Sequence, residues 1–94
     1  MKVTREMGIT HADFFRLLPR AMGEHPYEVE GRRVRVALPP GRLTITLGEE
    51  RERRFTAVVA MPCTDVEFVY EGVDEDVRAA FERYFDLRFM RGLG

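Results

Sequence analysis

Apolar residues in the first quarter of the chain recur at intervals of three and four, which predicts an amphipathic helix. The residues of this apolar face are Phe14, Leu17, Leu18 and Ala21, with Phe15 and Met22 beside them. Thr10 suits the N-cap position because its hydroxyl can accept a hydrogen bond from the amide of Asp13. Ile9, just before the cap, can pack on Phe14 as a hydrophobic staple. The helix is therefore expected to begin at Thr10.

Two features bound this helix. Pro19 has no amide to donate to the carbonyl of Phe15, so the regular helix is expected to end or kink near Leu18. On the N-terminal side, residues 2–7 alternate between apolar and polar side chains, which predicts either a short edge strand or a frayed chain end.

The next two segments alternate with a period of two and read as a β-hairpin, Tyr27–Glu30 followed by Arg33–Leu38. A two-residue turn at Gly31-Arg32 sets the register. It pairs charged with charged and apolar with apolar side chains: Glu30 with Arg33, Glu28 with Arg35, Val29 with Val34, and Tyr27 with Val36. We expect the following strand to place Leu43 opposite Leu38 across the loop 39–42. The charged run 48–54, GEERERR, is then interpreted as a solvated connection.

Residues 56–71 predict a second hairpin, with a turn at residues 62–65 around Pro62. In that register Met61, Val59 and Ala57 face Val66, Phe68 and Tyr70, and form one apolar face. The opposite face is only half polar, because it carries Val58, Ala60 and Val69 among Thr56, Glu67 and Glu71. After Gly72, Asp74 predicts a helix N-cap, and Glu75 and Asp76 suit its first turn. Apolar and aromatic residues then recur at helical spacing: Val77, Ala80, Phe81, Tyr84 and Phe85.

The fold class predicted by this order is α+β. We expect an antiparallel meander sheet of about five strands, an N-terminal and a C-terminal helix packed on one sheet face, and a short N-terminal edge strand. This order resembles the helix-grip and TATA-binding-protein-like architectures, in which a curved antiparallel sheet wraps a C-terminal helix. The resemblance is one of element order alone, so it implies no functional residues. The 94 residues fit a single domain.

Composition narrows the classes of function. The net charge is −1, which disfavours a protein that captures nucleic acid by charge, and no apolar run reaches the roughly 18 residues of a membrane span. Charge is unevenly spread: residues 32–42 hold four arginines and no acid, and residues 65–76 hold six acids and no base. A single cysteine and the absence of a basic-then-apolar leader favour a reducing, cytoplasmic location.

Cys63 is the candidate nucleophile, with His25 or His11 as its base, because the predicted turn would expose its thiol. Nearby Asp65 and Glu67 would raise the thiol pKa, so we favour a structural cysteine. One cysteine and two histidines cannot form a zinc site of standard spacing, and no metal or other cofactor is predicted.

A basic surface is the second alternative to a purely structural interpretation. Arg33, Arg35 and Arg42 would lie near one another on the sheet and could meet phosphates. Glu28 and Glu30 face two of them, and the aromatic residues point inward, so pairing within the chain is favoured over nucleic-acid binding.

These observations favour a small non-catalytic binding domain that self-associates or binds a protein partner or a small apolar ligand. A ligand would lie between the C-terminal helix and the sheet, among Ile45, Phe55, Val59, Phe68, Phe81 and Phe85. The favoured alternative is that these six side chains pack on one another as core. A partner or a second copy would cover the half-apolar face and the C-terminal tail, at Val58, Ala60, Val69, Phe89, Met90 and Leu93. The favoured alternative is that the first helix or the C-terminal tail covers that face.

Overall fold

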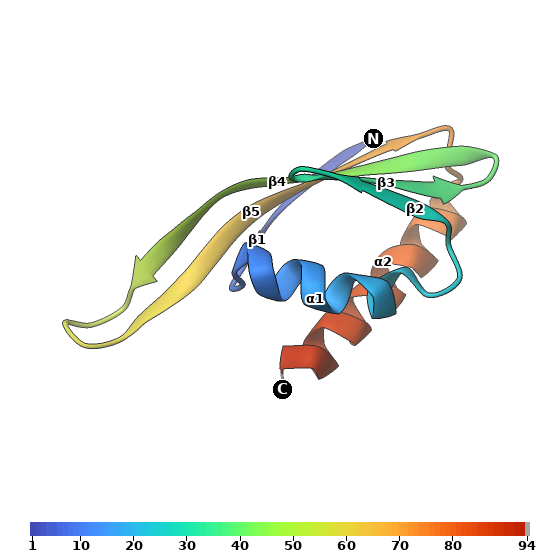
Figure 1. Cartoon of the computed structure of the whole chain (residues 1–94). Coiled ribbons are helices and arrows are strands. Elements are labelled where there is room, and N and C mark those ends of the chain that lie inside the picture. The colour runs from blue at the N-terminus through green and yellow to red at the C-terminus, as the bar shows by residue number, and fades with distance from the viewer. Residues whose placement is uncertain (94) are drawn as a thin grey trace.

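A computed structural model of the chain describes the backbone of residues 1–93 and the side chains of residues 1–90. The elements in chain order are β1 (Lys2–Met7), α1 (His11–Met22), β2 (Tyr27–Glu30), β3 (Arg33–Leu38), β4 (Gly41–Arg54), β5 (Ala60–Glu71) and α2 (Glu75–Leu93). The strands form one antiparallel sheet in the order β1-β5-β4-β3-β2. Both helices lie against the same face of this sheet (Figure 1). The α+β prediction is therefore confirmed, including the N-terminal edge strand.

The start of α1 is as predicted, whereas the regular helix extends beyond the predicted limit at Leu18. Thr10 Oγ1 accepts a hydrogen bond from the amide of Asp13 at 3.1 Å, and Ile9 is buried. The predicted end of the regular helix near Leu18 is wrong, because α1 continues through Pro19 to Met22 and has Gly23 as its C-cap. Ala21 and Met22, beyond the proline, are fully buried. Burial of this last turn offsets the roughly 3 kcal/mol that an interior proline costs a helix.

The β2–β3 register is confirmed at all four pairs, from Tyr27 opposite Val36 to Glu30 opposite Arg33. The next register differs from the prediction by two residues, because Leu38 pairs with Gly41 rather than Leu43. A shift of two preserves the faces of a strand, so Leu43 and Ile45 still point into the core. The sequence thus predicted the buried face of the strand correctly but predicted the loop between β3 and β4 too long.

The largest correction concerns β4 and β5. The charged run 48–54 is not a loop but the outer half of β4, and the predicted turn at 62–65 lies inside β5. The two strands pair from Arg42 opposite Glu71 to Arg54 opposite Ala60, and the chain reverses in between, at residues 55–59. A bulge in β4 between Leu47 and Glu50 inserts one extra residue, which switches the parity of the strand.

The core lies between the sheet and the two helices. Val34, Ile45 and Phe68 supply its sheet side, and α2 supplies a row of phenylalanines at helical spacing. The ring of Phe85 lies 5.2 Å from that of Phe68 and 4.4 Å from that of Phe89, measured between centroids. The prediction that Phe89 belongs to an exposed tail is wrong, because Phe89 is only 3% exposed. The helix continues through it and places it in this aromatic row.

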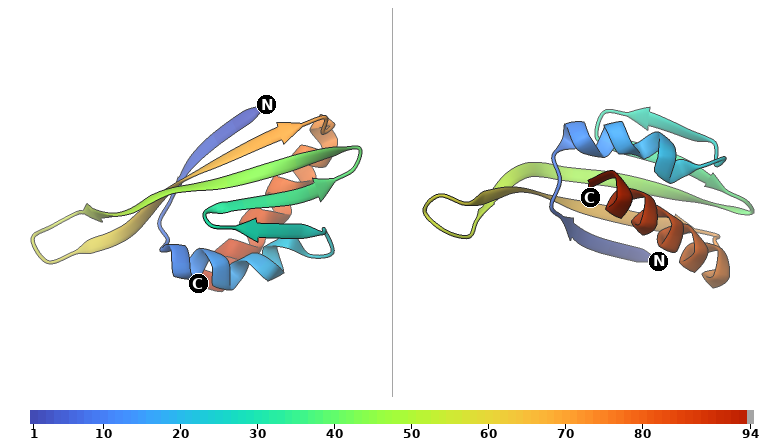
Figure 2. Two further views of the ribbon diagram at one scale, coloured as in Figure 1. Left: turned by 45° about the horizontal axis from the view of Figure 1, so that its top comes forward. Right: turned by 90° about the horizontal axis from the view of Figure 1, so that it is seen from below.

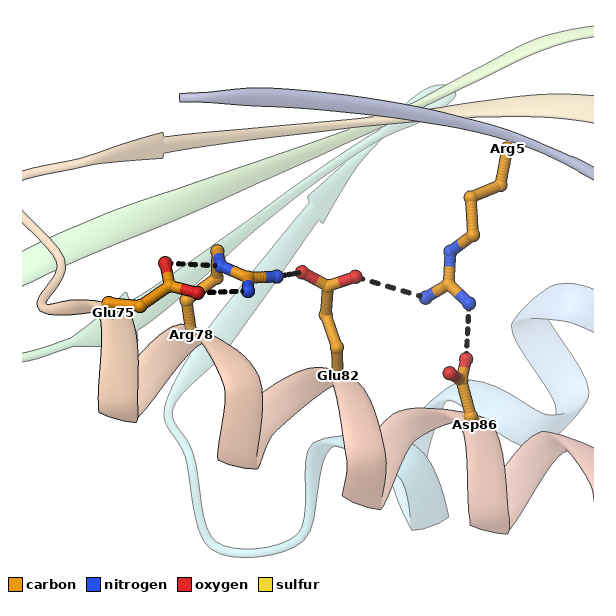
Figure 3. A network of polar contacts seen from close by, with 5 residues as sticks. All are labelled: Arg5, Glu75, Arg78, Glu82 and Asp86. Atoms are coloured by element: carbon orange, nitrogen blue, oxygen red, sulfur yellow. Dashed lines mark hydrogen bonds and ion pairs between the residues drawn. The ribbon is translucent and has the colours of Figure 1, made fainter.

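A polar network joins α2 to the edge of the sheet (Figure 3). Arg5 of β1 points to the helix side, where it pairs with Asp86 and lies 3.8 Å from Glu82. Arg78 pairs with both Glu75 and Glu82. The guanidinium of Arg5 also lies 4.8 Å above the ring of Phe68, so it makes a cation–π contact with the core.

The network shifts several pKa values, because its charged groups lie close together at the border of the core. Hydrogen bonds to Glu75 and then Glu82 raise the pKa of Arg78, and the same contact lowers the pKa of Glu75. Burial, followed by the negative charge of Glu82, raises the pKa of Tyr70 well above its usual range. All three shifts favour the protonation states at neutral pH, in which the arginines are charged, the carboxylates are ionised and the phenol is neutral.

Substitution of Gly41 tests the β3–β4 turn. A Cβ atom at Gly41 would overlap the carbonyl oxygen of Glu71 and the backbone of Gly72, neither of which can move without disturbing β5. We expect Gly41→Ala to lower the free energy of unfolding by about 2 kcal/mol or more, measured in urea. Gly8→Ala is the matched control, because its Cβ would meet only the Pro62 carbonyl oxygen, at 3.8 Å. Equal stability of the two variants would contradict the close approach.

Removal of Arg5 tests the network. We expect Arg5→Ala to lower the free energy of unfolding by about 2 kcal/mol, because Glu82 and Asp86 would lose a partly buried partner and Phe68 its cation. Arg42→Ala is the control, since Arg42 pairs with Glu71 in an exposed ion pair worth at most about 1 kcal/mol. If both substitutions cost the same in urea unfolding, the network does not hold α2 to the sheet.

Candidate functional site

The outer halves of β4 and β5 leave the body of the sheet as a projecting two-stranded ribbon (Figure 1). β3 pairs with β4 only as far as Thr46, and β1 pairs with β5 only as far as Thr64. Residues 48–63, here called the arm, therefore pair only with each other. The arm makes the molecule elongated, with extents of 48 × 23 × 22 Å, and both views in Figure 2 show it clear of the helices.

The arm ends in a tight reversal built around Thr56. Its hydroxyl oxygen accepts hydrogen bonds from the amides of Val58 at 3.2 Å and Val59 at 3.0 Å. The amide of Phe55 donates to the carbonyl of Val59 at 2.9 Å, which closes the ribbon. A threonine that caps its own turn in this way is a known turn signal. The proline and aspartate at 62–65 are a stronger turn signal in sequence, and they led the prediction to the wrong place.

After the bulge, alternate residues of the arm face opposite sides. Glu50 and Glu52 point to the helix side, where Glu50 accepts a hydrogen bond from the amide of His11 at 2.7 Å. Arg51 and Arg53 point to the other side, here called the outer face, together with Cys63.

Ion pairs on the outer face fasten the base of the arm to β1. Arg51 lies 3.0 Å from Glu6 and 3.1 Å from Asp65, and Arg53 also pairs with Glu6. The pKa of Arg51 is raised, chiefly by its hydrogen bond to Asp65. Arg51 and Arg53 of the GEERERR segment thus find a partner on β1, 45 and 47 residues away in sequence. This pairing favours a strand over a loop for the segment.

Cys63 lies beneath these ion pairs and is 3% exposed, so the expected exposure of its thiol is wrong. Burial, and then a hydrogen bond to Glu6, raise the pKa of the thiol. Both effects disfavour the thiolate that a nucleophile requires.

The two histidines are engaged elsewhere in the described part of the chain. His11 Nε2 lies 2.8 Å from the carbonyl oxygen of Gly48, and the His25 ring packs on Phe81 at 5.7 Å. The geometry therefore gives Cys63 no histidine as a base.

The tip of the arm carries an unusual cluster of exposed apolar side chains. Phe55 is 59% exposed, Val58 91%, Val59 46% and Met61 49%. A hollow of about 240 Å³ on the outer face is lined by Phe55, Met61, Pro62, Cys63, Gly8, Glu6 and Arg53. Between residues 53 and 64 the arm has two arginines and no acid, and Glu6 of β1 pairs with one of them, Arg53. This basic, apolar tip is the feature of the molecule that we consider the candidate site.

The residues of the predicted ligand site lie in two separate places in the structure. Ile45, Phe68, Phe81 and Phe85 are buried together between the sheet and α2. Phe55 and Val59 were placed there wrongly, because the displaced turn puts both of them at the tip of the arm. The rings of Phe81 and Phe85 lie 6.1 Å apart, so the four buried residues of this group fill the core with one another.

The predicted interface residues are divided as well. Val58 and Ala60 are exposed on the arm, whereas Val69 is half-buried in the body of the sheet between Lys2 and Thr44, so the three do not share one surface. Met90 is exposed on α2, Phe89 is buried, and the side chain of Leu93 lies outside the described residues.

The predicted basic surface is compensated within the chain. Arg35 lies 3.5 Å from Glu30, and Arg42 lies 3.3 Å from Glu71. Arg33 is directly opposite Glu30 in the β2–β3 register. The arginines of the body therefore face carboxylates, as the sequence predicted, and the only stretch of the arm with arginines and no acid is its tip.

Comparison with protein-family models, with curated proteins and with solved structures finds no match. Among the residues that the structure describes, no helix is long and apolar enough to cross a membrane. Nor do three or more histidine, cysteine or carboxylate side chains gather there as a metal site would require. The function must therefore be argued from the geometry of the arm.

Alkylation of Cys63 tests its burial. At pH 8 we expect the folded chain to react with iodoacetamide at least about tenfold more slowly than the chain unfolded in urea, because Cys63 is buried, and its raised pKa further reduces the thiolate fraction. Glu6→Gln should speed the reaction of the folded chain, since it removes the anion beside the thiol. Equal rates in the folded and unfolded chain would show an accessible, reactive cysteine.

The same pKa shift predicts a pH dependence of stability. Because the pKa of Cys63 is higher in the folded chain than the roughly 8.5 of a free thiol, stabilisation by the neutral thiol is complete below that pH and is lost as the pH rises through the folded value. We expect the difference in unfolding free energy between the wild type and Cys63→Ala to be smaller at pH 10 than at pH 7. An unchanged difference in urea unfolding would contradict the shift.

Proposed function

We propose that this chain is a small non-catalytic binding domain and that the arm is its binding element, which docks onto a protein surface. The single observation that carries the proposal is the exposure of Phe55, Val58, Val59 and Met61 at the end of a ribbon that leaves the body of the fold.

The arm does not contribute to the stability of the fold, which favours a role in binding. An isolated two-stranded ribbon is marginally stable in water, because its strands bury apolar surface on one side at most. Here the apolar tip lies beyond the reach of both helices and contributes nothing to the core. Apolar side chains clustered on a projection are typical of a surface that a partner covers.

The base of the arm is built to keep its direction fixed. Arg51 and Arg53 bind Glu6 on the outer face, and His11 binds Glu50 on the helix side. A ribbon held from both sides loses less conformational entropy on binding than a free loop does. This arrangement supports presentation of the tip as a preformed element.

The chemistry of the tip indicates the chemistry of its partner. The exposed apolar side chains require an apolar depression on the partner. Arg54 adjoins them, and residues 53–64 hold no acid, so carboxylates at the edge of that depression would favour binding.

Crosslinking from the tip tests this function. Replacement of Val58 by a photoreactive benzoylphenylalanine should yield a discrete crosslinked protein product in the native host, because Val58 is the most exposed apolar residue of the tip. Leu87 is the matched control position, since it is 43% exposed on α2, away from the arm. A second substitution, Phe55→Asp, should weaken the Val58 crosslink at least about tenfold by placing a charge in the contact.

Positions 55, 58 and 87 tolerate substitution, because replacing an exposed side chain away from the core changes the free energy of unfolding by only about 0.5 kcal/mol. Circular dichroism and urea unfolding should therefore be unchanged by any of these replacements. Identical crosslinks from positions 58 and 87, or no crosslink from position 58, would contradict a binding role for the arm.

A further inference from the structure

We infer that the free edge of β1 pairs with β1 of a second copy of this chain, antiparallel about a two-fold axis that passes through Thr4. The sheets of the two copies would then form one continuous sheet. The inference is independent of the arm. It is argued from the direction of the backbone groups of β1 and from the side chains that the pairing brings together.

β1 is an edge strand with an open side. It stands first in the strand order β1-β5-β4-β3-β2, and Figure 2 shows no other described helix or strand alongside its free edge. The amide of Tyr70 donates to the carbonyl of Met1 at 2.8 Å. Because hydrogen-bonded pairs alternate along an antiparallel ladder, the odd-numbered residues of β1 direct their backbone groups to β5. The even-numbered residues, Lys2, Thr4 and Glu6, therefore direct theirs to the open side.

A single register of antiparallel self-pairing uses all three of these residues. With the axis through Thr4, this residue lies opposite Thr4 of the second copy, and Lys2 lies opposite Glu6. Each of the three pairs then exchanges two backbone hydrogen bonds. An axis through residue 3 or residue 5 would leave one of the three without a partner inside the strand. An axis between two residues would set outward backbone groups opposite inward ones.

The side chains on the face of the sheet away from the helices are compatible with this register. Lys2 meets Glu6 of the second copy, and the two Thr4 hydroxyls meet each other, so opposite rather than like charges lie across the contact. Within its own chain Lys2 pairs with Glu67, and Glu6 pairs with two arginines of the arm. The contact therefore depends on the backbone hydrogen bonds and not on a new ion pair.

The helix side of β1 carries Arg5, and an inward-pointing charge on an edge strand commonly discourages pairing. Here Arg5 is bound to Asp86 of its own chain. In the register centred on Thr4, Arg5 faces half-buried Val3 of the second copy. Its aliphatic stem can cover Val3, and the two arginines do not meet.

β2, at the other edge of the sheet, is less suited to pair with itself. The amide of Ala37 donates to the carbonyl of Pro26 at 2.9 Å, so by the same alternation Tyr27 and Val29 direct their backbone groups outward. Self-pairing that joins Tyr27 to Val29 would set Glu28 directly opposite Glu28 of the second copy. Like charges opposed in this way destabilise a sheet. The charge pattern therefore favours β1 as the edge that self-associates.

The contact is small, because an edge strand buries less than the roughly 800 Å² per partner of a standard stable interface. We expect micromolar or weaker association, which sets the concentration range of the test. The two-fold axis reverses the direction of every strand. The two arms would therefore leave the joined sheet in opposite directions, and both tips would stay free.

Charge substitutions at Thr4 test the register, because this residue meets itself across the axis. Thr4→Lys and Thr4→Glu should each weaken the dimer of the purified chain by about tenfold in sedimentation equilibrium, since like charges then face each other. An equimolar mixture of the two variants should regain the association, because a lysine then faces a glutamate. Urea unfolding establishes that each variant folds.

Proline at position 4 tests the backbone contact. Proline has no N–H, and the N–H of Thr4 points to the open side, so Thr4→Pro removes no hydrogen bond within the single chain. We expect it to abolish the dimer and to leave a folded monomer. Val29→Pro is the matched control, since the N–H of Val29 points to the open side of β2. It should leave the association unchanged.

Amide hydrogen exchange locates the contact. The amides of Lys2, Thr4 and Glu6 should become more protected as the concentration of the chain rises, because the second copy then accepts their hydrogen bonds. The amides of Val3 and Arg5 already donate to β5 and should be protected equally at all concentrations.

Three results would overturn the inference. The first is a wild-type chain that remains a 10.9 kDa monomer at several hundred micromolar. The second is a mixture of Thr4→Lys and Thr4→Glu that associates no better than its components, and the third is a dimer that Thr4→Pro leaves intact. The crosslink from Val58 tests the proposed function separately, because the arm takes no part in this contact.

Discussion

The antiparallel pairing of β4 with β5 is the interaction on which the rest of the molecule depends. Between Arg42 and Leu47 it places Leu43 and Ile45 in the core opposite Tyr70 and Phe68, and it gives both helices their apolar floor. Beyond the bulge the same pairing continues without neighbours on either side and becomes the arm. One ladder of hydrogen bonds therefore builds the stable body and the projecting site, and the bulge separates them by reversing which side chains face the helices.

The body and the arm are stabilised by different forces. The body relies on packing, with an aromatic row on α2 that contacts Phe68, and its polar groups at the border are gathered in the network around Arg5. The arm has no core, and its base is held by charge-assisted contacts of Arg51 and Arg53 with Glu6. Because such exposed pairs weaken in salt while buried packing does not, the orientation of the arm should be more sensitive to ionic strength than the fold itself.

The candidate site could be predicted from the sequence only in part. The placement of Val58 and Ala60 outside the core agrees with the structure, in which both are exposed. The site itself could not be predicted, because Phe55, Val59 and Met61 are residue types common in cores. Their exposure depends on the position of the turn, which the sequence did not reveal. Thr56, which caps that turn with its hydroxyl, was the one local signal available, and Pro62 with Asp65 gave a stronger competing one.

The sequence by itself determined the local features: the N-cap at Thr10, the register of the hairpin at Gly31-Arg32, and the aromatic face of α2. It also determined which residues of β3 and β4 point into the core, because an error of two residues in the loop leaves the faces of a strand unchanged. These features depend on contacts between residues near in sequence or on a period that a shift of two does not alter. The tertiary structure decided the course of α1 through Pro19, the burial of Phe89 and the existence of the arm. In each case the residues that decide the structure are distant in sequence. The core buries the last turn of α1 and Phe89 of α2, and Glu6 on β1 pairs with Arg51 and Arg53, in a charged segment whose composition is typical of a loop.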